Sequence, residues 1–270
     1  MPGVILVVFD HPAAAGALLN AAQRLAALSG ATRINALLVR TLPEAMVSPS
    51  EEVLTEQREA KLRGLEASRA TAVRSVFDTW AANVPAGLSV EWTDIDGIAE
   101  LLVEERGQRA DYLVMEQPAR HDYGTSWHAL RIALFTTDRP VLVVPAESSA
   151  TFGRRVAIAW RDDGRATKAV LSALRCLTQA ERVFVLAGTR GDAAPQMPAI
   201  LAEHGIAAEL HALPIGPGMF GAALLEKAHQ LGADVLVMGA YQHSPLRQLL
   251  LGGVTRYMLS HADLPLLLRH

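Results

Sequence analysis

The sequence predicts an α/β protein with two similar domains, each a five-stranded parallel sheet with helices on both faces. Three observations support this fold class. Short runs rich in Val, Ile and Leu alternate with helical patterns along the whole chain. The two halves repeat the same order of segments. The chain has 270 residues, half of them hydrophobic, which is enough for two domains of about 130 residues with real cores.

The internal repeat is visible without gaps in two stretches. Residues 101–115 match residues 224–238, with Leu, Leu, Ala, Asp, Leu, Val and Met in the same places. Residues 131–140 match residues 256–265 through Arg, Leu, Asp and Pro. The offset between the copies is 123 residues in the first stretch and 125 in the second. The second copy therefore carries two extra residues between these stretches.

This repeat predicts two domains, residues 1–147 and 153–270, joined by a short linker rich in small residues at 145–155. Each domain should contain five strands, because short Val/Ile/Leu-rich runs are typical of parallel strands buried on both faces. The expected strands of the first domain cover residues 4–10, 33–39, 88–95, 111–117 and 141–145. Those of the second domain cover residues 155–160, 182–188, 207–215, 234–240 and 264–269.

A long helix is expected at about residues 51–83 of the first domain. Its hydrophobic residues fall near one face with charged residues between them, which predicts that this face packs against the core. The stripe consists of Leu54, Leu62, Leu65, Val73, Val76, Phe77 and Trp80. The last strand of each domain is apolar and would be aggregation-prone as a free edge. We therefore expect these two strands to cover each other in an internal pseudo-dimer about a local two-fold axis.

Composition and charge argue against several classes of protein. Residues 1–150 carry 19 acidic and 13 basic side chains, and the remaining residues carry 9 and 12, so neither half is basic enough to predict a nucleic-acid partner. No stretch approaches the 18 or so apolar residues that span a membrane, and the first strand lacks the basic residues of a signal peptide. The single cysteine, Cys176, is expected to be a buried thiol, which fits a reducing, cytoplasmic location.

No catalytic or metal-binding motif is recognisable in the sequence. A Walker-type phosphate loop needs Lys after Gly, and none of Lys61, Lys168 and Lys227 lies in a glycine-rich turn. Ser126 lacks the second glycine of a hydrolase elbow and is expected to be a helix cap or a surface hydroxyl. The nine histidines form no metal-binding pattern. Residues 216–221 spell a dinucleotide-binding pattern, but the next strand ends without the acid that would hold a ribose, so an ordinary βα loop is favoured.

The segment after the fourth strand of the second domain is unusual for its glycines. Gly239 ends the strand, and Gly252 and Gly253 are adjacent in or near a helix, where each costs about 1 kcal/mol relative to alanine. Either backbone N–H groups approach phosphate oxygens there, or the pair permits close packing of the helix on the sheet. Ser244 and Pro245 are suited to begin a helix, whose dipole would favour an anion.

Five strands per copy and the closing segment from Met238 onward resemble the universal stress protein family. The resemblance covers essentially the whole chain and identifies it as a tandem member. It implies the universal-stress-protein-like fold, of the adenine nucleotide alpha hydrolase type, with strand order 3-2-1-4-5 in each domain. ATP-binding members of the family carry Gly-x2-Gly-x9-Gly, followed by Gly, Ser, Thr or Asn, after the fourth strand. They also carry an Asp near the adenine at the end of the first strand.

The second domain matches this motif in part. Gly239 fills its first place, Gln242 stands where the second glycine is expected, and Gly252 closes it. At the end of the first strand, Trp160 and Arg161 replace the acid. The resemblance therefore implies a nucleotide site formed by Trp160, Arg161, Met238, Gly239, Gln242, His243, Ser244, Gly252, Gly253 and Thr255.

The first domain departs further from the motif. Glu116 replaces the first glycine, and Trp127 and His128 stand about where the glycine pair is expected. An acidic side chain and two rings would repel and block phosphates, although Asp10 keeps the acid on the adenine side. We therefore expect at most one working nucleotide site, in the second domain.

The resemblance predicts a stress-response regulatory protein that binds ATP or another adenine nucleotide without efficient catalysis, with slow ATP hydrolysis left open. Asp162 and Asp163 could hold Mg²⁺ beside a triphosphate, but capping the helix that begins near Gly164 is favoured, so the presence of Mg²⁺ stays open. The alternative is an interaction module in which both sites are degenerate. No nucleic-acid or membrane partner is expected, and a homodimer of whole chains is left open beside the internal pseudo-dimer.

Overall fold

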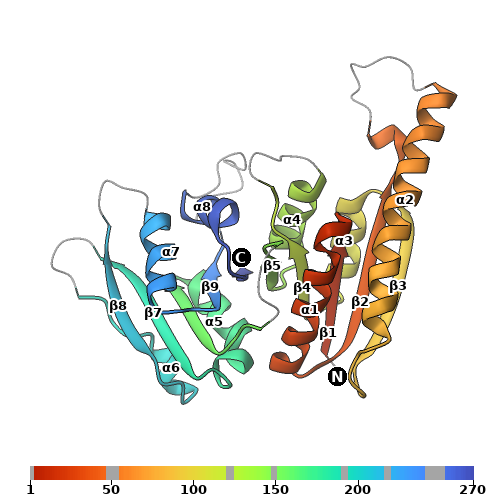
Figure 1. Ribbon diagram of the computed structural model, residues 1–270. Helices are drawn as coiled ribbons and strands as arrows, with labels where there is room; N and C mark the ends of the chain where they lie inside the picture. The colour runs from red at the N-terminus through yellow and green to blue at the C-terminus, as the bar shows by residue number, and fades with distance from the viewer. Residues whose placement is uncertain are drawn as a thin grey trace.

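The computed structural model describes residues 3–46, 55–119, 125–146, 151–189, 194–215, 220–240 and 253–270. These residues form one ten-stranded sheet with the order β3-β2-β1-β4-β5-β10-β9-β6-β7-β8. Its N-terminal half (β1 to β5) and its C-terminal half (β6 to β10) lie side by side (Figure 1).

The strands of the N-terminal half are β1 (Gly3–Phe9), β2 (Ala31–Thr41), β3 (Ser89–Gly97), β4 (Tyr112–Glu116) and β5 (Val141–Val144). Its helices are α1 (Pro12–Ser29), α2 (Glu56–Ala81), α3 (Ala99–Gly107) and α4 (Thr125–Thr136), with a 3-10 turn η1 at Pro43–Ala45. The strands of the C-terminal half are β6 (Arg155–Trp160), β7 (Arg182–Thr189), β8 (Glu209–Pro214), β9 (Val235–Gly239) and β10 (Leu266–Arg269). Its helices are α5 (Gly164–Leu177), α6 (Ala199–Glu203), α7 (Phe220–Gln230) and α8 (Gly253–His261). No helix within the described ranges has the length and apolar character needed to cross a bilayer.

The strand positions and the strand order within each half confirm the prediction. Each half is parallel throughout and follows the order 3-2-1-4-5. The expectation of two five-stranded sheets is corrected, because the halves share one sheet. β5 and β10 pair in antiparallel fashion, with Leu142 opposite Leu267. The two apolar edges therefore cover each other, as expected, and neither offers unpaired backbone groups to another chain.

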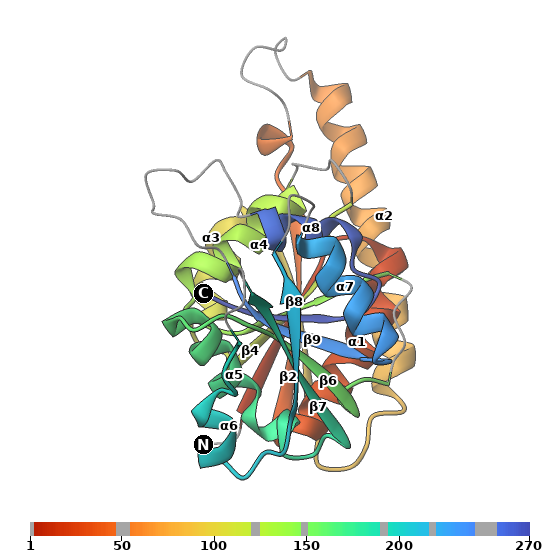
Figure 2. The ribbon, with the colours of Figure 1, turned by 90° about the vertical axis from the view of Figure 1, so that its left-hand side faces the viewer.

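Side chains of the strands alternate between two cores on opposite faces of the sheet. In β1, Ile5 and Val7 belong to the first core, whereas Leu6 and Val8 belong to the second. Helices α1, α2 and α5 contribute to the first core, and α3, α4, α7 and α8 contribute to the second. Helices accordingly lie on both sides of the strands (Figure 2). This pattern follows from the period of two in a strand, which sends successive side chains to opposite faces.

Hydrogen bonds on the first face also link the two halves. The Tyr112 hydroxyl in β4 donates to the main-chain oxygen of Ser172 in α5 at 2.7 Å. The side-chain amide of Gln179 donates to the main-chain oxygen of Leu28 at the same distance. Cys176 in α5 is buried in this core, as predicted. The halves are thus joined through packed helices as well as through the sheet.

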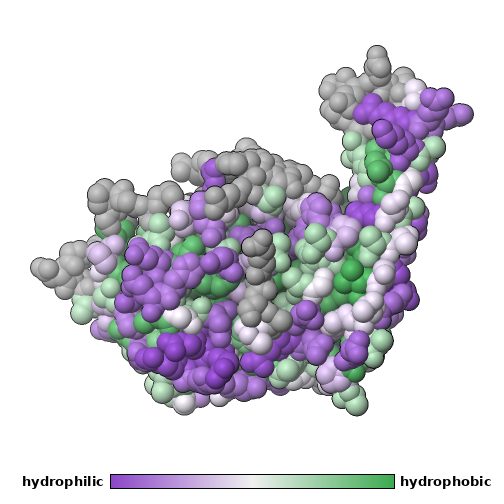
Figure 3. All heavy atoms as spheres, in the orientation of Figure 1, coloured by the Kyte–Doolittle hydropathy of each residue, from purple (hydrophilic) through white to green (hydrophobic). Residues whose placement is uncertain are grey.

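The long helix α2 packs on the core over its second part alone. Val73 is 0% exposed and Phe77 is also buried, as the stripe predicts, but Leu65 is 58% exposed. The first part of α2 projects beyond the sheet (Figure 1), so its apolar side chains have no core to contact. The prediction of core packing was therefore wrong for Leu65, and Leu54 lies outside the described residues. Figure 3 shows mainly hydrophilic residues at the projecting end, with a smaller hydrophobic area below them.

Candidate functional site

The topology marks one crevice in each half as the candidate site. The order of strands along the sheet reverses between β1 and β4 in the N-terminal half, and between β6 and β9 in the C-terminal half. In open α/β sheets, ligands bind outside the carboxyl ends of the strands at such a reversal. In the C-terminal half these ends are Trp160 and Gly239, and in the N-terminal half they are Phe9 and Glu116.

Three of the predicted site residues, Trp160, Met238 and Gly239, come together in the C-terminal half. Ala159 pairs with Met238 across β6 and β9, so Trp160 and Gly239 follow on neighbouring strands. Gly239 also lies against the first turn of α5. A Cβ at this position would lie 3.0 Å from the main-chain carbonyl carbon of Arg165. This close approach to backbone is by itself a reason for glycine at position 239.

The loop after β6 is held by a helix cap. The Asp163 side chain accepts hydrogen bonds from the backbone N–H groups of Arg165 at 3.1 Å and Ala166 at 2.9 Å. The Arg161 guanidinium donates to the other oxygen of the same carboxylate, with Nε at 2.8 Å. Burial raises the pKa of Asp163, but the Ala166 hydrogen bond and Arg161 together outweigh it and hold the pKa below its usual value. The predicted cap is therefore confirmed at Asp163, whereas Asp162 is exposed.

A cavity of about 620 Å³ opens beside these residues. It lies at the carboxyl ends of β6 and β7, and the segment that leads into α6 forms part of its wall. It is lined by Trp160, Arg161, Asp162, Ala187, Gly188 and residues 194–199. Small-molecule sites in proteins are typically about 300–1,000 Å³, so this cavity is large enough for a ligand of nucleotide size.

Of the two adjacent glycines that the sequence singled out, the structure describes Gly253. Gly253 is the first residue of the described helix α8, and a Cβ placed on it would meet no described atom within 4 Å. Close packing of α8 on the sheet therefore gives no reason for glycine at this position. Thr255, in the first turn of α8, is buried. The predicted site residues outside the described ranges are Gln242, His243, Ser244 and Gly252.

The last glycine of the dinucleotide-like pattern has a packing explanation. A Cβ on Gly221 in α7 would lie 2.8 Å from the Cβ of Tyr257 in α8. Contact between two helices therefore requires this glycine. The rest of the pattern, residues 216–219, falls outside the described ranges.

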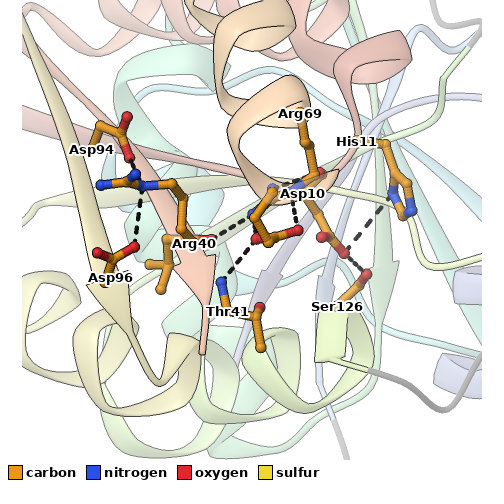
Figure 4. Close-up of polar contacts among 10 residues, drawn as sticks. Asp10, His11, Arg40, Thr41, Arg69, Asp94, Asp96 and Ser126 are labelled. Carbon is orange, nitrogen blue, oxygen red and sulfur yellow. Dashed lines mark hydrogen bonds and ion pairs between the residues drawn. The ribbon is translucent and has the colours of Figure 1, made fainter. Parts of the chain in front are cut away.

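The corresponding crevice in the N-terminal half is filled by polar side chains (Figure 4). Glu116 is 11% exposed and shares a hydrogen bond with Nδ1 of His11. The Ser126 hydroxyl donates to the carboxylate of Asp10. Burial raises the pKa of the Glu116 carboxyl, and the hydrogen bond with His11 offsets this in part. The cavity that remains measures about 30 Å³, about the volume of one water molecule in the liquid.

Arg69 ties the carboxyl ends of β1 and β2 to helix α2 (Figure 4). Its guanidinium donates to the main-chain oxygens of Asp10 at 2.8 Å and Val39 at 2.6 Å. It also forms an ion pair with Glu66 at 2.7 Å, and both partners are largely buried. The carboxyl ends of β1 and β2 are thus occupied by protein groups.

The sequence of residues 156–270 matches the universal stress protein family. The C-terminal half is a universal stress protein domain. No curated protein sequence matches the chain significantly. Assignment of this domain to the family supports a role in the stress response.

The similarity of fold extends beyond this universal stress protein domain to the whole chain. A universal stress protein from Archaeoglobus fulgidus DSM 4304 superposes with a TM-score of 0.71 at 13% identity, covering 98% of this chain and 95% of that one. A functionally unknown protein from Pseudomonas aeruginosa PAO1 has a TM-score of 0.60 at 16% identity, with 98% and 92% covered. At such identities the likeness shows the fold, so the N-terminal half also has the fold of universal stress proteins.

Sequence reasoning missed the polar cluster of the N-terminal half. Asp10, His11 and Glu116 place their ligand atoms within 4.8 Å of one another. No motif links them, because Glu116 follows His11 by 105 residues. A usable signal was that Asp10 and Glu116 end neighbouring strands of the predicted sheet. Ser126 was expected to cap a helix or face solvent, but it is buried within α4 beside Asp10.

Trp127 and His128 do not fill the N-terminal crevice together. Trp127 packs against the second core, and His128 is exposed to solvent. The groups that occupy the crevice are the carboxylates of Asp10 and Glu116.

Proposed function

We propose that the universal stress protein domain binds an adenine nucleotide, ATP or a close relative, in the cavity beside Trp160, and that it acts as a regulatory binder without efficient catalysis. The contrast between the two crevices supports this proposal. The cavity in the C-terminal half measures about 620 Å³, against about 30 Å³ in the N-terminal half. A nucleotide fits the first volume and not the second.

The lining of the larger cavity suits the parts of a nucleotide. Trp160 and Met197 offer apolar surface to a base, and the Arg161 guanidinium offers N–H donors to phosphate oxygens. Outside the residues that line this cavity, α8 begins at Gly253, where backbone N–H groups and the helix dipole favour an anion. No described atom would contact a Cβ at Gly253. Glycine at such a position is expected where a ligand approaches the backbone closely.

The carboxylates beside the cavity argue for binding over hydrolysis. Asp163 is already engaged by two backbone N–H groups and by Arg161. Asp162 is the exposed carboxylate of this loop and would be the residue to contact a Mg²⁺ that accompanies the phosphates. One exposed carboxylate falls short of the metal-holding and nucleophile-positioning groups that fast phosphoryl transfer needs.

The test is the thermal stability of the whole chain with and without nucleotide. ATP at 100 times its dissociation constant should add about 2.7 kcal/mol to the free energy of unfolding, which raises the melting temperature by about 5 °C for a two-state protein of this size. Gly253→Trp should abolish the shift, because the ring would occupy the space in front of the α8 N-terminus. Gly64→Trp is the matched control, since a Cβ placed on Gly64 in α2 likewise meets no described atom within 4 Å. A shift that Gly253→Trp retains would argue against this site.

An interaction module remains the second candidate, and Gly239 favours it. The contact of Gly239 with the first turn of α5 accounts for this glycine without any phosphate. On that interpretation the motif residues are structural, and the fold serves assembly with a protein partner. A melting temperature unchanged by millimolar ATP, ADP or AMP would favour this candidate over nucleotide binding.

A further inference from the structure

We propose that Asp10, His11 and Glu116 bind a divalent transition-metal ion of the Zn²⁺ class in the N-terminal half. The proposal is independent of nucleotide binding, because it concerns the other crevice. The three side chains come from the β1–α1 junction and from the end of β4, and their ligand atoms lie within 4.8 Å of one another. The described residues thus bring together one imidazole and two carboxylates at the point where ligands bind in sheets of this kind.

The spacing is close to that of a tetrahedral site. Zn²⁺ binds histidine nitrogen and carboxylate oxygen at about 2.0–2.2 Å, which separates neighbouring ligand atoms by about 3.4 Å. His11 Nδ1 and Asp10 Oδ2 are 3.9 Å apart. His11 and Glu116 are closer, because they share a hydrogen bond, and would move apart slightly when the ion enters. The side chain of His11 has room for this movement, since it is 60% exposed, whereas that of Glu116 is 11% exposed.

Electrostatics favours a cation in this crevice. The carboxylates of Asp10 and Glu116 lie beside one imidazole, that of His11. Partly buried carboxylates are costly without compensating charge. In the structure, the hydrogen bond with His11 offsets part of this cost for Glu116. A metal ion would take the place of this hydrogen bond and would interact with Asp10 at the same time, and because metal ligands must be deprotonated, binding should release a proton.

The donor set selects the class of metal. Mg²⁺ and Ca²⁺ prefer oxygen ligands alone, whereas an imidazole with carboxylates suits Zn²⁺, Mn²⁺ or Co²⁺. The hydrogen bond from Ser126 to Asp10 would orient the carboxylate, as outer-shell partners commonly do. Three protein ligands leave the fourth position to water. The bound ion would tie the start of α1 to the end of β4.

The experiment is calorimetric titration of the metal-free chain with ZnCl₂ near neutral pH, without nucleotide. One equivalent should bind, with proton release seen as a dependence of the heat on the buffer. His11→Gln and Glu116→Gln should each weaken binding by tenfold or more, because loss of even an outer-shell partner costs about 10- to 100-fold in metal affinity. His11 is exposed, so His11→Gln keeps the test valid even where Glu116→Gln does not fold.

The matched control is His229→Gln. His229 pairs with Asp263 through Nε2 at 2.6 Å on the surface, and the described residues bring no third ligand to it. Zn²⁺ binding should survive this change. Equal Zn²⁺ affinity in the wild type and in His11→Gln would overturn the proposal, and so would an equal loss in His229→Gln.

Discussion

Glu116 and Gly239 occupy equivalent positions in the two halves of one sheet. Each is the last residue of the fourth strand of its half, and each pairs with the fifth strand, at Val144 and Arg269 respectively. In the N-terminal half the carboxylate of Glu116 contacts His11 and closes the crevice. In the C-terminal half the absence of a side chain at Gly239 lets the first turn of α5 approach the strand end. The equivalent strand ends thus differ: Glu116 places a carboxylate in the N-terminal crevice, whereas Gly239 allows backbone to pack against the strand.

Alanine substitutions at Gly239 and Gly253 should have opposite effects on stability. Gly239→Ala forces a Cβ to within 3.0 Å of the Arg165 backbone and should lower the free energy of unfolding by about 1–3 kcal/mol. Gly253→Ala meets no described atom and should leave stability unchanged or raise it by up to about 1 kcal/mol. Urea unfolding curves of both variants decide this. Equal losses would show that the packing of α5 is not what requires glycine at position 239.

Removal of the cap at Asp163 should destabilise α5. Asp163→Ala leaves two backbone N–H groups without their acceptor and should cost about 1 kcal/mol, whereas Asp162→Ala removes no cap and should have little effect. The folded pKa of Asp163 is lowered from its usual 3.8, so its contribution is present above that pH and is lost as the pH falls through the folded pKa. Chemical unfolding at neutral and acidic pH should therefore show the difference between wild type and Asp163→Ala shrinking in acid.

Cys176 should resist alkylation in the folded protein. Burial raises the pKa of its thiol from 9.0 to about 11, so the reactive thiolate is scarce and covered. Iodoacetamide at about pH 8 should label the urea-unfolded chain rapidly and the native chain slowly, as mass spectrometry will show. The raised pKa also means that the buried, protonated thiol makes its full contribution to the free energy of unfolding below pH 9. This contribution is lost as the pH rises towards 11. Rapid labelling of the native chain would contradict the buried position.

Two substitutions in α2 should separate its packed part from its projecting part. Val73→Ala opens a cavity at a fully buried position and should cost about 2 kcal/mol. Leu65→Ala removes a side chain that is 58% exposed and should change stability by less than about 0.5 kcal/mol. Both stability changes are measured from the midpoints of urea unfolding curves. A large loss in Leu65→Ala would mean that the projecting part packs against something in solution.

ATP turnover should be slow if the proposed nucleotide site exists. We expect phosphate release with excess ATP and Mg²⁺ to stay below about 1 s⁻¹, the lower end of the range of kinases. Turnover by the Asp162→Ala, Asp163→Ala double variant should stay below the same limit, because neither residue is expected to act as a catalytic base or nucleophile. If the wild type released phosphate faster than this limit and the double variant did not, the result would reveal an active site at the end of β6.

Much of the fold could be predicted from the sequence, because the interactions that define each element are local. The Val/Ile/Leu runs of β1 and β9 and the Asp163 cap of α5 depend on residues within a turn or a strand of one another. The apolar sequences of β5 and β10 predicted that these strands pair with each other, since each would otherwise leave backbone groups unpaired at an edge. Their union into one ten-stranded sheet is where the expectation needed correction.

Local sequence patterns did not predict the polar cluster, because it depends on how the strands order and pair in the sheet. Asp10 and Glu116 meet because Val8 pairs with Met115, a fact of tertiary structure that no local pattern encodes. Leu65 looked like a core residue because helical periodicity reveals a face but not where the sheet beneath it ends. The sequence by itself determined the strands, the Asp163 cap and the repeat, through forces that act over a few residues. Tertiary structure alone decided which side chains share a crevice, because pairing and packing bring together residues that lie far apart in the chain.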